Sequence, residues 1–409
     1  MTERGTAQLR AGSAWALASV AVALVCGLLR TIVIARLIAP VEIGLMGIAL
    51  LALGFVEAGA STGVDTALVA EPKEIEEYID PAFTIQVIRG IVVFGLLWAA
   101  APALARAFRD SDAVSVIRSV AAIAVLRGLA NPAVALPVRR LDFRRLFWWS
   151  LPEVLSTFCI TVALGLVRRD VWALVIGVVA GQAIGAIASY GLAPRMPRLV
   201  VARERILKLL RFGRFVSGSR ALMYFSVNLD SAVVGMTIGT HALGIYQFAT
   251  RVAELPVVTV TKAVAQVALP ALSAAPSGRA ARTRTWRTML GWVLAVNAAA
   301  AILILLFGDA AIVALVGPQW LEAVPVMRIL TVAMVFRALV ILAGQLLDAV
   351  GQPALTLRIN AVRLGTLIVV LGPLAAWGGL PGVAQAVLLS NAGAALLALR
   401  LSARVLQRE

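Results

Sequence analysis

Apolar runs long enough to cross a membrane recur along the whole chain, and short polar joints separate them. A membrane-spanning helix needs about 20 mostly apolar residues. Proline and glycine mark most of the joints, as at Ala39–Pro40 and Gly317–Pro318. The pattern predicts twelve helices, at residues 13–37, 42–68, 82–105, 114–137, 147–167, 171–193, 214–238, 242–268, 288–307, 322–347, 355–376 and 380–400. The predicted fold is an all-α polytopic membrane protein, with no stretch left for a soluble domain.

Composition supports this fold and excludes several classes of function. Apolar residues make up 61% of the 409 residues and charged residues only 14%, whereas soluble domains are about 25% charged. The net charge of +16 does not indicate nucleic-acid binding, because most of the basic residues lie in short joints between spans. The sequence has no glycine-rich phosphate loop followed by lysine, and no cluster of metal-binding residues at ligand spacing. We therefore expect neither an enzyme nor a metal site.

The distribution of basic residues predicts how the helices are oriented. Positive side chains are retained on the cytoplasmic side of a membrane. One set of alternating joints, together with both termini, carries 23 lysines and arginines, and the other set carries four. Both termini are therefore predicted to be cytoplasmic. The first apolar run is predicted to remain as helix 1, because it continues for a full span without a clear cleavage site.

The two halves of the chain resemble each other. A shift of 200 residues places residues 38–45 on residues 238–245, and each segment follows the first helix of its half. Six helices per half is an even number, so equivalent helices run in the same direction and the symmetry axis lies along the membrane normal. We predict two pseudo-symmetric six-helix lobes, at residues 1–193 and 214–409, around a central cleft.

Residues 194–213 form a basic linker between the two predicted lobes. Apolar residues recur at helical spacing within 200–210, which predicts an amphipathic helix on the cytoplasmic surface. A solvated linker is the alternative. The joint at residues 71–80 is acidic, although the pattern of basic residues places it on the cytoplasmic side, and the sequence assigns it no role.

Arginines inside the apolar runs are the leading candidates for function. A charge in hydrocarbon costs about 2.5–3.5 kcal/mol, so it is seldom kept without a use. Arg127 and Arg337 lie near mid-span in corresponding places of the two halves. Two opposed guanidinium forks suit a pyrophosphate, and structural pairing with a carbonyl or carboxylate is the alternative. Arg30 on helix 1 and Arg251 on helix 8 complete the predicted substrate-binding set.

Four acidic residues are candidates for coupling or gating: Asp230, Glu57, Asp65 and Glu254. Asp230 corresponds to Arg30 in the shifted half, which predicts an ion pair between the lobes, either switchable or static. Glu254 follows Arg251 by three residues, so these two side chains can also neutralise each other.

Glu57 and Asp65 lie on helix 2, on either side of the small residues 59–63, which allow close helix contact and local unwinding. Low dielectric favours neutralisation of a carboxylate, so both are candidates for a coupling proton or sodium ion. Glu153 on helix 5 and Asp348 at the end of helix 10 are further candidates. No other cofactor is expected.

Several short motifs together resemble a known family. They are RLIAPVEIG at residues 36–44, RRLDFRR at residues 139–145, Asp230, Ile238–Gly239, LGIY at residues 243–246, Ala249, Leu255–Pro256, Leu269–Pro270 and VGPQW at residues 316–320. Their order and spacing resemble the Wzx-like oligosaccharide flippases of polysaccharide synthesis, close to the branch of colanic acid and teichuronic acid exporters. This family belongs to the multidrug/oligosaccharidyl-lipid/polysaccharide (MOP) superfamily.

The resemblance implies a flippase that moves an undecaprenyl-pyrophosphate-linked oligosaccharide from the inner to the outer leaflet by alternating access. It also implies a bacterial cytoplasmic (inner) membrane location, membrane lipids as surroundings, and a polysaccharide polymerase and glycosyltransferases as partners. A cation-coupled drug exporter of the same superfamily is one alternative. A non-transporting membrane scaffold or acyltransferase is the other.

Overall fold

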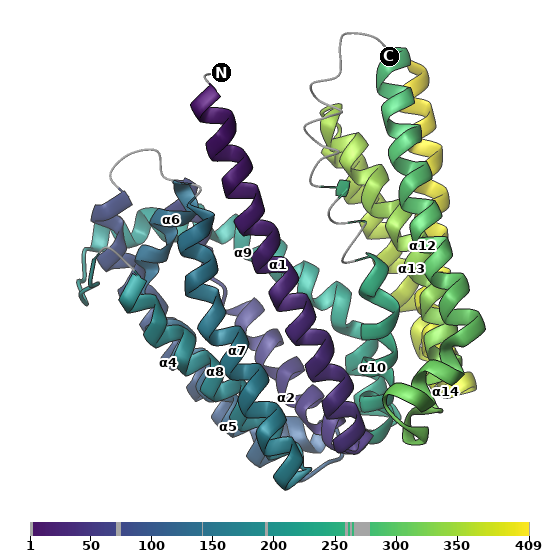
Figure 1. Cartoon of the computed structure of the whole chain (residues 1–409), viewed down its shortest axis with the longest axis horizontal. Helices are drawn as coiled ribbons and strands as arrows, with labels where there is room; N and C mark the ends of the chain where they lie inside the picture. Colours follow the sequence, from purple (N-terminus) through teal and green to yellow (C-terminus); the bar gives the residue numbers. More distant parts are fainter. Residues whose placement is uncertain are drawn as a thin grey trace. The chain divides into compact units, whose positions relative to one another are not determined.

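The computed structural model describes residues 3–70, 75–140, 142–192, 195–257, 261, 264–265 and 279–408. Within these ranges the chain is almost entirely helical and contains no strand (Figure 1). The helices are α1 (Glu3–Leu37), α2 (Pro40–Gly59), α3 (Val64–Ala70), α4 (Ile75–Ala107), α5 (Ala113–Leu129), η1 (Pro132–Val134), α6 (Ala135–Arg139), α7 (Phe143–Arg168), α8 (Val171–Leu192), α9 (Arg203–Thr237), α10 (Thr240–Pro256), α12 (Arg279–Leu315), η3 (Pro318–Trp320), α13 (Ala323–Ala349) and α14 (Pro353–Arg408).

Each predicted span overlaps helical structure, and the prediction of an all-α polytopic membrane protein is confirmed. Among the described residues, eight helices are long and apolar enough to cross a membrane, and the count is nine if α5 and the segment Pro132–Arg139, bent by 63° from each other, form one broken span. The two last predicted spans form α14, which is broken at Gly379 by a positive φ of 56°. Helix α9 is not among the eight because charged and polar residues are interspersed with its apolar ones, and α10 has only 17 described residues. The predicted eighth span continues to residue 268, and Lys262 in it lies outside the described residues.

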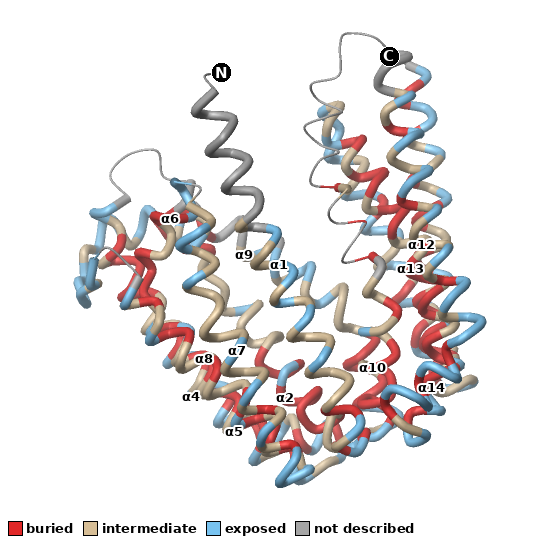
Figure 2. The backbone as a smooth tube through the Cα atoms, in the orientation of Figure 1, coloured by how far each residue is buried: buried red, intermediate tan, exposed pale blue. Residues whose placement is uncertain are grey.

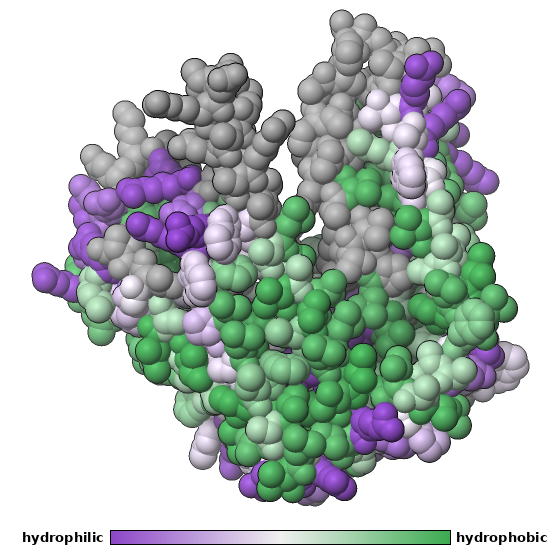
Figure 3. All heavy atoms as spheres, in the orientation of Figure 1, coloured by the Kyte–Doolittle hydropathy of each residue, from purple (hydrophilic) through white to green (hydrophobic). Residues whose placement is uncertain are grey.

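Apolar side chains face outward as well as inward, as expected for a protein in lipid. In Figure 3 hydrophobic side chains dominate the visible surface of the helices, and hydrophilic ones gather near helix ends. Leu96, Leu306 and Trp377 are among the exposed large hydrophobic residues. An exposed apolar surface of this extent would favour association in water, so the surface indicates a membrane environment.

Residue contacts divide the chain into two compact units, Met1–Leu229 and Asp230–Glu409. We call these unit 1 and unit 2. The boundary falls inside α9, so most of this helix belongs to unit 1 by its contacts.

In unit 1, α4 packs along α5, and α7 packs along α8 and α1. Helix α5 also contacts α2 and α8. In unit 2, α13 packs along α14 and contacts α12 and α10. Among the membrane spans, α2 and α13 are the most buried (Figure 2), and each carries a residue of the candidate site.

The small residues predicted to unwind helix 2 do interrupt it. Helix α2 ends at Gly59, α3 begins at Val64, and Gly63 has a positive φ of 62°. Gly213 of α9 lies directly against this break, because a Cβ built on Gly213 would be 1.7 Å from the carbonyl oxygen of Thr62. The contact requires glycine at position 213.

We expect the substitution Gly213→Ala to lower the stability of the protein by about 1–3 kcal/mol, because an added methyl group forces the backbones apart. Gly218 on the same helix is the matched control, since a Cβ there would meet nothing within 4 Å. Gly218→Ala should be neutral or should stabilise the helix by up to about 1 kcal/mol. Thermal unfolding followed by tryptophan fluorescence compares the two, and equal melting temperatures would contradict the expected contact.

Candidate functional site

Arg127 and Glu57 form an ion pair between two helix ends of unit 1. The Nη1 atom of Arg127 lies 2.5 Å from Oε2 of Glu57. Arg127 is in the last turn of α5, where the helix dipole favours a cation. Glu57 is near the end of α2, where the same dipole disfavours an anion. The positive charge of Arg127 therefore offsets the unfavourable interaction between the Glu57 carboxylate and the end of its own helix.

Gln182 connects this pair to a second carboxylate. Its Oε1 accepts a hydrogen bond of 3.0 Å from Nε of Arg127, and its Nε2 donates one to Oε1 of Glu153. Four helices, α2, α5, α8 and α7, thus contribute to one polar chain, which we call the unit 1 network: Glu57, Arg127, Gln182 and Glu153. Each member holds the orientation of the next, so the group is preorganised.

An open pocket lies at the end of this network. It has a volume of about 190 Å³ and is lined by α1 and α7, with Arg30, Glu153 and Thr157 as polar members. At the other end, Oε1 of Glu57 is buried and has no hydrogen-bond partner among the described residues. A buried acceptor without a donor is costly, and a proton or small cation would satisfy it.

Unit 2 contains an equivalent ion pair. The Nη1 atom of Arg337 on α13 lies 2.6 Å from Oε1 of Glu254 on α10. These helices correspond to those of Arg127 and Glu57 in the predicted repeat. Each unit therefore pairs an arginine of its fourth helix with a glutamate of its second.

Asp230 lies close to this pair and is held by its own unit. Its carboxylate accepts hydrogen bonds of 2.6 Å from the hydroxyl of Tyr246 and 2.8 Å from the backbone N–H of Ser231. Asp230 and Tyr246 are both buried. The predicted pairing of Asp230 with Arg30 stays a prediction.

Arg251 interacts electrostatically with Glu254, as their spacing predicts, although its side chain is exposed. We call Asp230, Tyr246, Arg251, Glu254 and Arg337 the unit 2 cluster. Asp65 belongs to neither group. It lies in the first turn of α3 and accepts a hydrogen bond of 2.6 Å from Gln86.

Three polar residues in or beside these groups are not among the candidates named from the sequence. Gln182 and Tyr246 are common in helices, and only their partners reveal their importance. Arg363 falls inside the predicted span 355–376, lies within α14, and interacts electrostatically with Arg337 and Asp230. Its position, eight residues inside the predicted span 355–376, is the sequence signal for Arg363.

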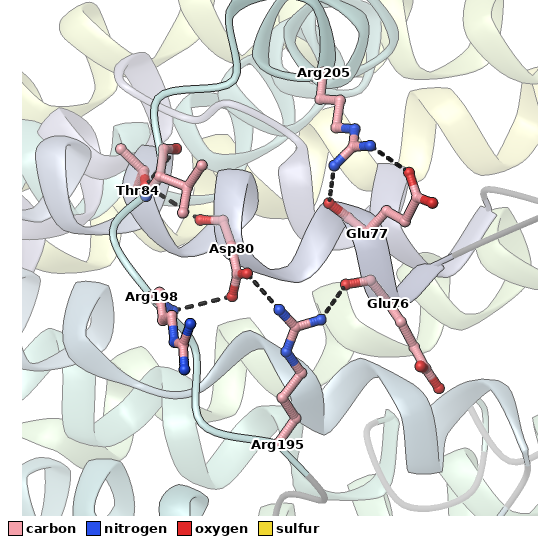
Figure 4. A network of polar contacts seen from close by, with 8 residues as sticks. Glu76, Glu77, Asp80, Thr84, Arg195, Arg198 and Arg205 are labelled. Atoms are coloured by element: carbon pink, nitrogen blue, oxygen red, sulfur yellow. Dashed lines mark hydrogen bonds and ion pairs between the residues drawn. The ribbon is translucent and has the colours of Figure 1, made fainter.

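The acidic segment at residues 71–80 acquires a structural role from residue 76 onward; residues 71–74 lie outside the described ranges. Asp80 forms an ion pair of 2.5 Å with Arg195 and accepts a 3.0 Å hydrogen bond from the backbone N–H of Arg198 (Figure 4). Arg195 also donates to the carbonyl oxygen of Glu76, and Thr84 exchanges two hydrogen bonds with the backbone of Val200. Residues 195–202 are therefore fixed along the first turns of α4.

The next part of the predicted linker is the beginning of α9, and it is also anchored in unit 1. Arg205 forms an ion pair with Glu77, and Lys208 donates a hydrogen bond of 2.9 Å to the hydroxyl of Tyr78. Leu209 is buried in a hydrophobic cluster with residues of α3, α4 and α6. The predicted amphipathic helix is thus continuous with α9, and its apolar side packs on protein. We call the contacts of residues 195–209 with α4 the linker clasp.

Comparisons with known proteins identify a family and relatives that match most of the chain. The profile of the family described as polysaccharide biosynthesis protein matches residues 33–325. The succinoglycan biosynthesis transport protein ExoT of Rhizobium meliloti (strain 1021) is 24% identical over 301 residues, which cover 74% of this chain and 61% of ExoT. The teichuronic acid biosynthesis protein TuaB of Bacillus subtilis (strain 168) is 24% identical over 293 residues, 71% of this chain and 60% of TuaB. The chain thus spans about three fifths of the length of these two relatives.

Solved structures share the fold. The lipid II flippase MurJ in an inward closed conformation superposes with a TM-score of 0.78 at 14% identity, covering 94% of this chain and 86% of that one. An inward-facing multidrug resistance MATE family transporter of the MOP superfamily gives a TM-score of 0.71 at 15% identity, covering 94% and 95%. These identities establish the fold alone. The chain has the fold of MOP-superfamily proteins, and it belongs to the polysaccharide biosynthesis protein family, as the sequence motifs predict.

Proposed function

We propose that the protein is a flippase that moves a pyrophosphate-linked lipid oligosaccharide from the inner to the outer leaflet of a bacterial cytoplasmic membrane by alternating access. The observation that carries the proposal is the equivalent arginine–glutamate pair in each unit. A paired guanidinium is held in place without an unbalanced charge, and its fork matches phosphate oxygens. The names of ExoT, TuaB and MurJ, which concern polysaccharide biosynthesis and lipid II flipping, support this class of substrate.

An exchange of partners on each arginine, from glutamate to phosphate, supplies a mechanism. The side chain of Arg127 is 46% exposed, so an arriving phosphate can compete with Glu57 for the guanidinium. A displaced glutamate then has no cation partner, and a proton or sodium ion neutralises it. Substrate binding and ion binding are thereby coupled at Glu57 and at Glu254. In this proposal both chain termini are cytoplasmic, because the joints rich in lysine and arginine are retained on the cytoplasmic side of the membrane.

The test uses the purified chain in liposomes that contain a fluorescent undecaprenyl-pyrophosphate oligosaccharide. We expect the label to become accessible to an impermeant quencher at least about tenfold faster than in liposomes without protein, a difference of about 1.4 kcal/mol in the barrier. Equal rates would refute the proposal. The carboxylate oxygen of Glu57 without a partner favours a second candidate, a cation-coupled drug exporter, and transport of an organic cation instead of the lipid would support it.

A further inference from the structure

Arg363 lies deep inside a membrane span of unit 2. It follows the start of α14 at Pro353 by ten residues, which is about 15 Å of helix, or half of the hydrocarbon thickness. Its side chain is partly buried. The residue thus lies nearly three turns from the start of the helix.

The surroundings of Arg363 place it beside Arg337. Ile359, one turn earlier on α14, is buried in a cluster with Leu339 and Val340 of α13, and Phe336 packs against the same cluster. Arg337 follows Phe336 directly, and its charge and that of Asp230 both interact with Arg363. Two guanidinium groups therefore lie near each other on packed helices.

The carboxylates near Arg363 already have partners. Glu254 is paired with Arg337, and Asp230 accepts hydrogen bonds from Tyr246 and Ser231. Among the described residues, Arg363 forms no hydrogen bond or ion pair of its own. Its charge is thus opposed by a neighbouring arginine and only partly offset by Asp230.

The polar groups of the two units differ in formal charge as a result. Unit 1 has two arginines, Arg30 and Arg127, and two glutamates, Glu57 and Glu153, at its network and pocket. Unit 2 has three arginines, Arg251, Arg337 and Arg363, against Asp230 and Glu254. The formal charge of the unit 1 group is zero, whereas that of the unit 2 group is positive, and Arg363 provides the difference.

We propose that Arg363 and Arg337 together form an anion site in unit 2 that takes the pyrophosphate of the substrate. A charged residue inside a membrane usually marks a ligand or ion pathway, and two guanidinium forks on packed helices can each take one of the two phosphoryl groups. The inference rests on the proposed function for the nature of the substrate. It adds that unit 2 makes the stronger contact with the headgroup, and that Arg363 is the residue responsible.

The experiment measures binding of inorganic pyrophosphate to the purified full chain by titration calorimetry. Arg363→Met keeps much of the side-chain length but removes the charge, and we expect it to weaken binding at least about tenfold, as expected for loss of a charge-assisted contact. Arg363→Lys keeps the charge without the guanidinium fork, so its affinity for pyrophosphate should lie between those of the wild type and Arg363→Met. Arg358→Met is the control, because Arg358 lies on the same helix with an exposed side chain, and it should bind as the wild type does.

A second readout separates binding from folding. Among the described residues Arg363 has no ion-pair partner and its charge is opposed by that of Arg337, so Arg363→Met should raise the melting temperature while it weakens binding. Wild-type affinity in Arg363→Met, or no pyrophosphate binding by the wild-type chain, would overturn the inference. Failure of the lipid-flipping assay together with Arg363-dependent pyrophosphate binding would refute the proposed function and leave the anion site standing. Phosphate bound as tightly as pyrophosphate would refute the two-fork geometry.

Discussion

A chain in which Arg127 and Arg337 are both replaced by glutamine is expected to flip lipid-linked oligosaccharide at least about a hundredfold more slowly than the wild type. Each substitution removes charge-assisted hydrogen bonds to phosphate, worth about 1.5–3 kcal/mol apiece. Either single variant should keep part of the rate, because the equivalent pair in the other unit remains. The fluorescent-lipid assay in liposomes measures all three.

Loss of the arginines also leaves Glu57 and Glu254 without their ion-pair partners, which lowers stability. The control is therefore a fourfold variant that adds Glu57→Gln and Glu254→Gln. It should recover most of the melting temperature but none of the flipping, because the phosphate ligands are still missing. Transport at the wild-type rate by the double variant would sink the assignment of these arginines to substrate binding.

Reversal of one charge in the linker clasp should also have a large effect. The side chain of Asp80 is 14% exposed and accepts from both Arg195 and the backbone of Arg198. Asp80→Arg removes both contacts and places two cations together, so we expect a loss of about 2–3 kcal/mol in stability. Residues 195–202 should then become sensitive to proteolysis, which limited trypsin digestion would detect.

The exchange of both charges tests whether the ion pair itself is responsible. Asp80→Arg combined with Arg195→Asp should restore part of the lost stability, although the backbone of Arg198 still lacks its acceptor. Glu322→Gln is the surface control, because its pair with His241 is mostly exposed and such pairs contribute at most about 1 kcal/mol. If Asp80→Arg were no more destabilising than Glu322→Gln, the clasp would have no role in holding the linker.

The helical frame of this protein follows from local sequence. Runs of apolar residues define the spans, and glycine with proline defines their ends, as at Gly379–Leu380–Pro381, where α14 breaks. The unwinding of helix 2 was predictable for the same reason, since small residues cluster at 59–63. These features depend on neighbours in the chain, so the sequence is sufficient to predict them.

The polar pairs depend on contacts across the fold and are harder to predict. Arg127 and Glu57 are both recognisable as charges in apolar runs, but 70 residues separate them, and nothing in their local sequence joins them. The linker clasp joins residues more than 110 apart. Candidate residues could therefore be named from the sequence, whereas the choice between ion pair and ligand site required their neighbours in space.

The charge difference between the two units has an electrical consequence. A shift of the four charged side chains at the unit 1 network and its pocket along the membrane normal would move no net charge through the membrane potential. The same shift in unit 2 would move one positive charge, at about 2.3 kcal/mol per 100 mV. A bound pyrophosphate with two negative charges would reverse that sign. The voltage that opposes movement of empty unit 2 in one direction would then assist its movement when it is loaded.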